Sequence, residues 1–396
     1  MAQHKILVSG ASIAGLTLVY WLKQYRFEVT VLERASELRL GGQNIDVKGA
    51  AWEIVKKMGL EQKIREANTT EVGIRFVNTR NKTVAEFAKD DAMSMTQELE
   101  ILRGDLVSIL YEQVKDSTKF YFCDHIEALT ESSVGVDVQF KSGLTNNFDL
   151  VVIAEGIGSR TRQLLFGNQV QFKYLGVYTA YFTAPRAPTD NEWARWCNAS
   201  EGIVFLIRPD NYGTTRASIN FRSPEQGYEK LPVAEQKQLL IDKIKHVAWE
   251  TPRLIEAIKQ SDDFYLERLS QVKAPHWHKG RVAMIGDAAY SVTPIAGKGT
   301  DLAIAGAYLL AGELLENDNY QTAFKAYEEQ LRPYVNKVQK LPPGVPRLVY
   351  PKSKTGVAIL NFFFSLAGSK PVKFILKMLG KNKKQPKQEL LLPNYK

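Results

Sequence analysis

A short apolar run, a glycine turn, a helical stretch and a second apolar run follow one another at the start of the chain. Ile6–Val8 predicts a buried strand, the stretch from about Ile13 to Tyr25 predicts a helix, and Val29–Leu32 predicts another strand. Together they form a βαβ unit, in which the crossover makes the two strands run parallel. No other feature of the sequence constrains the fold as strongly, and it predicts an α/β protein.

The turn between the first strand and the helix, Gly10–Gly15, carries a dinucleotide-binding pattern in which Ser12 replaces the middle glycine. A pyrophosphate would sit on the positive end of the helix that begins here. Glu33, at the end of the second strand, can accept hydrogen bonds from a ribose 2′-hydroxyl. An ordinary strand–helix turn with an exposed glutamate is the structural alternative. The predicted contacts of a nucleotide cofactor on this Rossmann-like unit are Gly10, Ser12, Ile13, Ala14, Gly15, Glu33 and Arg34.

A second motif near the end of the folded part combines an acid with two glycines. The buried run Val282–Ile285 predicts a strand that delivers Asp287 to its carboxyl end, where ligands bind in open α/β sheets. The glycines lie just before a long predicted helix, whose N-terminus can stabilise negative charge on a ligand ring. Taken alone, a Gly-Asp pair after a strand would be a structural turn. The candidate cofactor contacts of this motif are Asp287, Pro294, Gly297, Gly299 and Thr300.

A third motif, Glu155–Arg162, lies between the other two. In this order the three resemble the fingerprints of the group A FAD-dependent monooxygenases typified by p-hydroxybenzoate hydroxylase. The resemblance extends from about residue 5 to about residue 340, and the chain is similar in particular to the tetracycline-inactivating flavin monooxygenases. It implies FAD as the cofactor and NAD(P)H as co-substrate. It also implies that Asp287 binds the ribityl chain and that Gly156 and Arg162 serve both nucleotides.

The resemblance adds two positions and shows three departures. Arg103, which leads a predicted helix, matches an arginine that touches FAD, and Gly42 lies in a loop similar to the one beside the flavin ring. A surface arginine and a flexible surface turn are the structural alternatives. Besides Ser12, Glu155 replaces an aspartate and Tyr290 replaces a histidine. None of these changes removes a group that the redox chemistry needs, because the flavin carries that chemistry.

The implied activity is hydroxylation of a small aromatic or polycyclic compound with NAD(P)H and O₂, through a flavin C4a-hydroperoxide. The sequence offers no Ser-His-Asp or Cys-His arrangement that would suggest a protein nucleophile. Two other functions stay open. One is a protein that binds FAD or another ligand without oxygenating anything, and the other is a membrane-associated hydroxylase of quinone-type substrates.

The middle of the chain, at about 170–270, has β-rich runs that are dense in aromatic residues. We interpret it as a mixed β-sheet domain inserted into a Rossmann-like FAD-binding domain that is followed by C-terminal helices. The predicted division is 1–70, 98–170 and 275–340 for FAD binding, 71–97 and 171–274 for the substrate-binding sheet, and 341–396 for a basic helical tail.

Three residues of the inserted sheet are candidate substrate contacts: Tyr178, Tyr181 and Arg216. Tyrosine can offer an apolar ring and a hydroxyl to an aromatic ligand, and arginine can meet an acidic group. Core packing of the tyrosines and a surface position of the arginine are the alternatives. The run at 176–181 lacks the glutamine and histidine expected of a tetracycline site.

Positive charge is concentrated at the C-terminal end. The net charge is +9, yet residues 340–396 hold twelve Lys or Arg and one acid, so the rest is close to neutral. Nucleic acid is not an expected partner, because such a protein would carry its charge on the folded domain. An apolar run at 356–364 is too short to span a bilayer, and 372–378 is amphipathic among lysines. Weak peripheral membrane contact therefore stays open beside simple packing of the tail on the body.

The remaining expectations concern location and assembly. Cys123 and Cys197 form no CxxC pair and predict two buried structural thiols in a reducing cytoplasm. The first apolar run begins at Lys5 without a basic leader or cleavage site, so we expect a cytoplasmic protein without a secretory signal. The five histidines show no metal spacing, and no metal site is predicted. The expected partners are a small aromatic substrate and O₂, in a monomer or a dimer.

Overall fold

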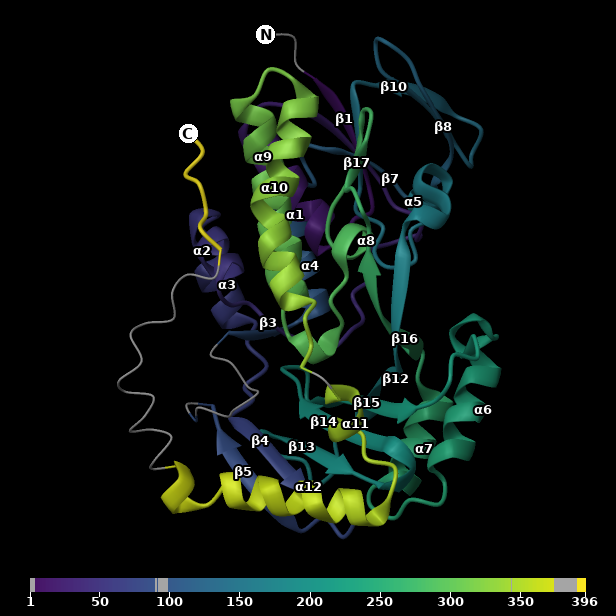
Figure 1. Cartoon of the computed structure of the whole chain (residues 1–396), viewed down its shortest axis with the longest axis vertical. Coiled ribbons are helices and arrows are strands. Elements are labelled where there is room, and N and C mark those ends of the chain that lie inside the picture. Colours follow the sequence, from purple (N-terminus) through teal and green to yellow (C-terminus); the bar gives the residue numbers. More distant parts are fainter. Residues whose placement is uncertain (1–3, 90, 92–98, 343, 374–389) are drawn as a thin grey trace.

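The computed structural model describes residues 4–89, 91, 99–342, 344–373 and 390–396. Two large sheets lie at opposite ends of the molecule in space (Figure 1). One is a largely parallel sheet with helices, and the other is a mixed sheet inserted between its strands. The expected α/β class, with a Rossmann-like half and an inserted sheet, is confirmed.

The first sheet has the strand order β17-β18-β11-β1-β2-β7, and all of its neighbours except β17 and β18 pair in parallel. Its strands are rich in buried Val, Ile and Leu, as expected of a parallel sheet that is covered on both faces. The strands are β1 (Lys5–Ser9), β2 (Glu28–Leu32), β7 (Lys119–Tyr121), β11 (Leu150–Ile153), β17 (His278–Lys279) and β18 (Val282–Met284).

Helices cover one face of this sheet and a small antiparallel sheet covers the other (Figure 1). The long helix α9 packs against α1, α2 and α10. The helices of this half are α1 (Ile13–Gln24), α2 (Ala50–Lys57), α3 (Glu61–Glu66), α4 (Arg103–Glu112), α5 (Arg160–Phe166), α8 (Asp287–Tyr290), α9 (Gly299–Glu316) and α10 (Tyr320–Val338). The small sheet is β8 (Ile126–Glu131), β9 (Val136–Phe140) and β10 (Thr145–Phe148).

The second sheet has seven strands in the order β16-β12-β15-β14-β13-β4-β5. Only β13 and β4 pair in parallel, so the sheet is mixed. Its strands are β4 (Gly73–Val77), β5 (Thr83–Ala88), β12 (Gln171–Pro185), β13 (Trp193–Asn198), β14 (Ile203–Pro209), β15 (Thr214–Arg222) and β16 (Tyr265–Lys273). The long pair β12 and β16 runs from this sheet back toward the first one (Figure 1).

The two faces of the second sheet have different surroundings. One face buries Phe205, Phe221 and their neighbours beneath α6 (Val233–Ile244) and α7 (Thr251–Gln260). The other face is turned toward the first half, since Val177 and Leu269 on it cluster with Ile295 of the 3-10 turn Pro294–Ala296. Because neighbours across paired strands share a face, the strand register assigns every residue of the sheet to one side or the other.

The C-terminal part of the chain crosses between the two halves. After α10 come α11 (Val345–Val349) and α12 (Lys354–Ala367), and α12 packs on β5. Residues 390–396 return to α9, where the Tyr395 hydroxyl donates to Glu313 at 2.7 Å. Most of the predicted amphipathic stretch at 372–378 lies outside the described residues. Among the helices that the structure describes, none combines the length and the apolar character needed to cross a bilayer.

A buried ionic cluster joins the halves. A short two-stranded sheet of the first half, β3 (Asn44–Asp46) and β6 (Glu100–Leu102), lies against the end of β14. Arg208 of β14 donates to both oxygens of Glu71, at 2.8 and 3.0 Å, and also pairs with Glu100. Asn44 and Thr69 donate to the other Glu100 oxygen at 2.8 and 2.7 Å. Both carboxylates are almost fully buried, so the guanidinium is their main compensation.

We therefore expect Arg208→Met to destabilise the fold strongly. The change leaves two buried carboxylates without their cation, a loss of about 3–5 kcal/mol. The measurement is thermal unfolding followed by circular dichroism, on the wild type and the variant at the same pH.

Lys245→Met is the matched control, because the Lys245–Asp242 pair is largely exposed. We expect that control to cost less than about 1 kcal/mol. Equal, small shifts in the two variants would contradict a structural role for the cluster.

Candidate functional site

The turn that begins α1 brings backbone segments too close together for side chains. Gly10 has φ +113°, and a Cβ on it would lie 2.5 Å from the carbonyl oxygen of Ala154. A Cβ on Gly15 would lie 2.0 Å from the carbonyl oxygen of Gly10. Ser12 caps the helix, since its hydroxyl donates to the Ala154 carbonyl at 3.1 Å and accepts from the Gly15 N–H at 3.4 Å. The turn thus presents a helix N-terminus at the carboxyl edge of the sheet, suited to a phosphate.

Glu33 is held against the same turn. One of its carboxylate oxygens accepts the N–H of Ala11 and the other accepts the N–H of Ala35, each at 2.9 Å. A carboxylate has about four acceptor positions, so both oxygens can still receive ribose hydroxyls. Arg34, the next residue, is exposed.

Burial raises the pKa of the Tyr265 hydroxyl on β16, and Arg39 and Arg34 oppose that rise, so these basic groups face the second sheet.

Arg103, the first residue of α4, lies within electrostatic reach of both predicted acids. Burial and the charge of Arg39 lower the pKa of its guanidinium, whereas Asp287 and Glu33 act in the opposite direction. The guanidinium donates to the carbonyls of Arg39 at 2.9 Å and Gly41 at 3.3 Å. The structure therefore brings Glu33, Arg103 and Asp287 together, although they come from distant parts of the sequence.

Asp287 and Gly42 complete this group. The Asp287 side chain has exposed surface, yet desolvation raises the pKa of its carboxyl, with a hydrogen bond from Ser291 and the charge of Arg103 opposing the rise. A side chain on the wall of a deep opening has both properties. Gly42 has φ +130°, and a Cβ on it would lie 3.0 Å from Cδ of Arg103. Glycine is thus required where this loop passes the arginine.

The middle motif is tied together from within. The carboxylate of Glu155 accepts the hydroxyls of Ser9 and Ser159 at 2.6 Å each and that of Thr161 at 2.5 Å. Gly156 follows with φ +76°. Hydroxyl groups of the chain itself therefore satisfy the carboxylate of Glu155, which stands where the family has aspartate.

Arg162 links the middle motif to the Gly-Asp motif. Its guanidinium donates to the carbonyls of Ile157 at 2.6 Å and Ala288 at 3.0 Å. Burial lowers the pKa of Arg162 to about 10, and Glu155 opposes that fall. The other replacement, Tyr290, is buried in the core, where its hydroxyl bonds to that of Tyr327 at 3.1 Å.

The predicted residues before α9 lie on the surface of the same region. Pro294, Gly297 and Gly299 are exposed, and Gly297 has φ +58°. Thr300 is half-buried in the first turn of α9, and no hydrogen bond from the N-cap residue's side chain caps that helix. An uncapped helix N-terminus can stabilise negative charge on a ring placed before it.

Facing this region, the second sheet carries two tyrosines and a carboxylate. Tyr181 of β12 lies directly opposite Tyr265 of β16, and Glu267 is two residues further along β16 on the same face. Both hydroxyls lie close enough to the Glu267 carboxyl to favour its ionised form. Burial, followed by the charge of Asp287, raises the pKa of Glu267 to about 7, while the two tyrosines oppose the rise. The cluster therefore lies near the Gly-Asp motif of the other half.

The three predicted substrate contacts do not lie together. Tyr178 lies on the opposite face, buried beneath α6 and α7, and its hydroxyl accepts the N–H groups of Gln226 at 2.9 Å and Gly227 at 3.0 Å. Arg216 does share the face of Tyr181, but its Nε pairs with Asp210 at 2.9 Å. Tyr178 thus belongs to the core, and Arg216 already has a carboxylate partner.

The sequence analysis missed the two residues that β16 supplies, Tyr265 and Glu267. Their alternation with the buried residue Leu266 was the available signal, because side chains two apart on a strand share one face. It also missed Tyr350, directly after α11, which packs against this sheet face. Burial is the main cause that raises the pKa of the Tyr181 hydroxyl, and Tyr350 adds to that rise.

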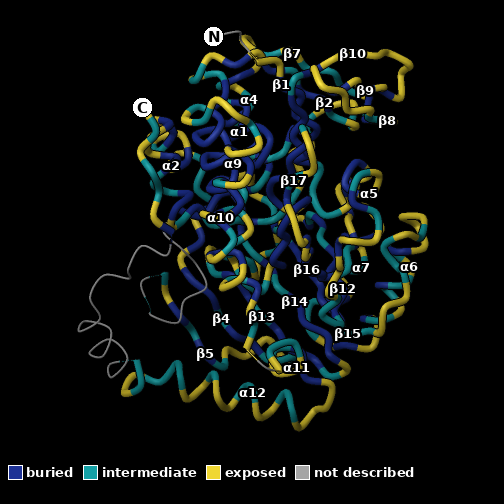
Figure 2. Tube along the Cα trace, turned by 45° about the horizontal axis from the view of Figure 1, so that its top comes forward, coloured by how far each residue is buried: buried dark blue, intermediate teal, exposed yellow. Residues whose placement is uncertain are grey.

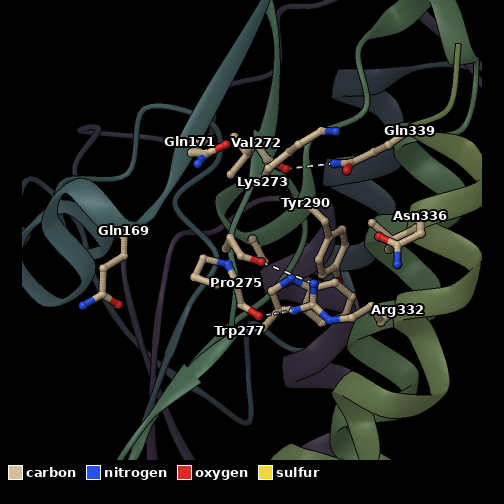
Figure 3. Close-up of a pocket in the computed structure, with 13 residues that line it drawn as sticks. Gln169, Gln171, Val272, Lys273, Pro275, Trp277, Tyr290, Arg332, Asn336 and Gln339 are labelled. Carbon is tan, nitrogen blue, oxygen red and sulfur yellow. Dashed lines mark hydrogen bonds between the residues drawn. The ribbon is translucent and has the colours of Figure 1, made fainter.

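A separate pocket of about 310 Å³ opens between α10 and the start of β17 (Figure 3). Trp277, Tyr290 and Arg332 line it, and the Arg332 guanidinium lies 4.4 Å from the centre of the Trp277 ring. None of the predicted cofactor or substrate residues borders this pocket. The candidate site is therefore the region between Glu33, Arg103, Asp287 and the Tyr181 face.

Comparison with known sequences assigns this chain to a protein family. A family described as "FAD binding domain" matches residues 3–341. A flavin-dependent monooxygenase of Legionella longbeachae is 37% identical over 345 residues, which cover 85% of this chain and 87% of that protein. An FAD-dependent monooxygenase of Sarocladium schorii, asL6, is 31% identical over 418 residues, covering 99% of this chain and 98% of its own length.

Solved structures agree with this assignment. The crystal structure of tetracycline destructase Tet(51) has a TM-score of 0.82 and 32% identity, and covers 99% of this chain and 100% of its own. Klebsiella pneumoniae HpxO, complexed with FAD and uric acid, has a TM-score of 0.73 at 19% identity over 94% of this chain and 95% of its own, which shows the shared fold. The chain belongs to the group A, p-hydroxybenzoate hydroxylase-like family of FAD-dependent monooxygenases.

Proposed function

We propose that this protein uses NAD(P)H and O₂ to hydroxylate a small aromatic or polycyclic compound that carries an ionisable hydroxyl. The observation that carries the proposal is the cluster of Tyr181, Tyr265 and Glu267, which faces the Gly-Asp motif of the cofactor half. FAD, when bound, would accept hydride and activate oxygen.

The residues on the cofactor side fit FAD by their chemistry. The N-terminus of α1 would receive the pyrophosphate, since Gly10 and Gly15 leave room for it at the sheet edge. Glu33 would accept the ribose hydroxyls, and Asp287 would hold the polar chain between phosphate and ring. Arg103 would balance the negative charge that these groups and the phosphates bring together. The N-terminus of α9 would stabilise negative charge on the flavin ring.

The face of the second sheet would position the substrate. Tyr181 and Tyr265 offer aromatic surface and hydroxyl groups, and Glu267 can accept a proton once it is ionised. Removing a proton from a phenolic hydroxyl makes the ring richer in electrons, which favours its attack on an oxygen atom. The second sheet and Tyr350, which directly follows α11, would also keep water from the reacting atoms.

The charges of the site indicate which substrates it would accept. Glu267 and Asp287 are acidic, and Arg216 is already paired with Asp210. Arg34, Arg39 and Arg103 lie on the cofactor side, where they would meet the phosphates. A neutral phenol-like compound is therefore a better fit than a carboxylate.

Cys197 is buried as predicted, but Cys123 is exposed. We also propose that the protein works in the cytoplasm, where NAD(P)H is available and both free thiols stay reduced.

The test is oxidation of NADH and NADPH by the purified, FAD-loaded protein in air, with hydrogen peroxide assayed alongside. The panel should hold phenols, quinolones and polycyclic compounds, and tetracyclines because Tet(51) is 32% identical. We expect one compound class to speed oxidation without a matching release of peroxide.

If no compound accelerates either nucleotide, the oxygenase proposal fails. A protein that binds FAD or another ligand without oxygenating it would then be the better account. If NADH or NADPH is oxidised quickly but an equal amount of hydrogen peroxide is released, the panel lacks the true substrate. That result would establish only that the nucleotide reduces the flavin.

Glu267 should make turnover depend on pH. Below about pH 7 its carboxyl is protonated and cannot accept a proton, and above that pH it is ionised. We expect kcat/KM for a phenolic substrate to rise as the pH increases through about 7. Glu267→Gln should remove this rise and lower activity at pH 8 by about 100-fold, the scale of general base catalysis.

Glu256→Gln is the control, because Glu256 is exposed on α7 and pairs with Lys259. It should keep both the rate and the pH profile. An unchanged alkaline rise in Glu267→Gln would assign the titration to another group.

A further inference from the structure

The helix α12 packs on the second sheet through one narrow side. Phe364 stacks on Phe76 of β4, with ring centroids 3.9 Å apart, and Ala367 joins the same cluster. Gly368, just after the helix, lies so close to Ala85 of β5 that a Cβ would be 2.9 Å from its side chain. These contacts fix the helix on the body and determine which of its sides points outward.

The outward side of α12 is apolar. Ile359, Phe362, Phe363 and Leu366 are 53%, 65%, 59% and 50% exposed. Their spacing of three, four and seven residues places them on one face of the helix. Figure 2 shows α12 along the edge of the molecule with exposed residues recurring along its length. Single exposed apolar residues are ordinary, but four on one helical face form a patch that calls for a partner.

The chain at both ends of this helix is basic. Lys352 is exposed just before the helix, Lys354 is exposed as its first residue, and Lys370 is exposed just after it, with Glu201 as the acid beside Lys352. The sequence contains no Asp or Glu from residue 330 to residue 388. A protein partner of mixed charge would not need lysines at both ends of the helix without acids in the same stretch of chain, whereas an anionic lipid surface complements both ends at once.

We propose that α12 docks this protein on an anionic membrane surface. The helix would lie in the plane of the interface, with its four outward apolar side chains among the lipid chains and the lysines at the head groups. Its 14 residues make a helix about 21 Å long, which is too short to span a bilayer. The contact is therefore peripheral and reversible.

The test is co-sedimentation of the full-length, FAD-loaded protein with vesicles. Vesicles of phosphatidylcholine mixed with phosphatidylglycerol should carry the protein down, and vesicles of phosphatidylcholine alone should carry down much less. Raising the salt concentration should weaken binding, because it screens the lysines. The double variant Phe362→Ser/Phe363→Ser should lower the partition coefficient roughly tenfold or more, since it removes two exposed rings.

Val134→Ser/Leu144→Ser is the matched control, because these residues are 75% and 51% exposed on the small sheet far from α12. It should bind as the wild type does. Circular dichroism and FAD content should be unchanged in both double variants, so a loss of vesicle binding is separate from the fold and from the proposed reaction.

Three outcomes would overturn the proposal. The wild type could fail to bind anionic vesicles, or the α12 variant could bind them as well as the wild type. The third is a wild-type dimer that becomes a monomer in the α12 variant without any vesicle binding, which would make a second copy the occupant of this face.

Discussion

The approach of Gly10 to the backbone of Ala154 is the contact on which the cofactor half depends. With 2.5 Å between a hypothetical Cβ and the Ala154 carbonyl oxygen, only glycine lets β1 turn into α1 at this point. The turn sets the N-terminus of α1 at the sheet edge and holds Glu33 through the Ala11 N–H. Arg103 of α4 lies within electrostatic reach of both Glu33 and Asp287, the first residue of α8. The turn therefore fixes one side of a space to which α4 and α8 add their own polar groups.

The second sheet supplies the side chains that would face the substrate. The buried cluster of Arg208, Glu71 and Glu100 fixes the sheet to the cofactor half, and the pair β12 and β16 carries Tyr181 and Glu267 to the facing side. Because the sheet and the Gly-Asp motif are held by separate contacts, the motifs for FAD can stay the same while the facing side chains differ. In this chain those side chains are acidic and aromatic, which is the basis of the proposed substrate class.

Local patterns predicted the parts of this fold that depend on short segments. The βαβ unit was predictable because β1, α1 and β2 are adjacent in sequence, and α1 begins at Ile13 as predicted. The combination of Tyr178 and Tyr181 as substrate contacts could have been rejected from the sequence. Residues three apart on a strand point to opposite faces, and the structure puts Tyr178 in the core.

Other parts could not be read from local patterns. Glu267 joins Tyr181 only through the pairing of β12 with β16, whose residues are more than eighty positions apart in the chain. No local pattern marks Arg208 as buried, because its partners, Glu71 and Glu100, come from other segments of the chain. The individual cofactor contacts and the domain boundaries stay predictions.

The most direct test of the account is a titration of the apoprotein with FAD, followed by quenching of flavin fluorescence, in the wild type and in Gly10→Ala. Gly59→Ala is the control, because Gly59 shares a positive φ of +70° but has nothing within 4 Å of a Cβ. We expect stoichiometric binding by the wild type and the control. Gly10→Ala should bind at least about tenfold more weakly, a loss of about 1.4 kcal/mol. A folded Gly10→Ala protein that binds FAD as tightly as the wild type would contradict the placement of the cofactor at this turn.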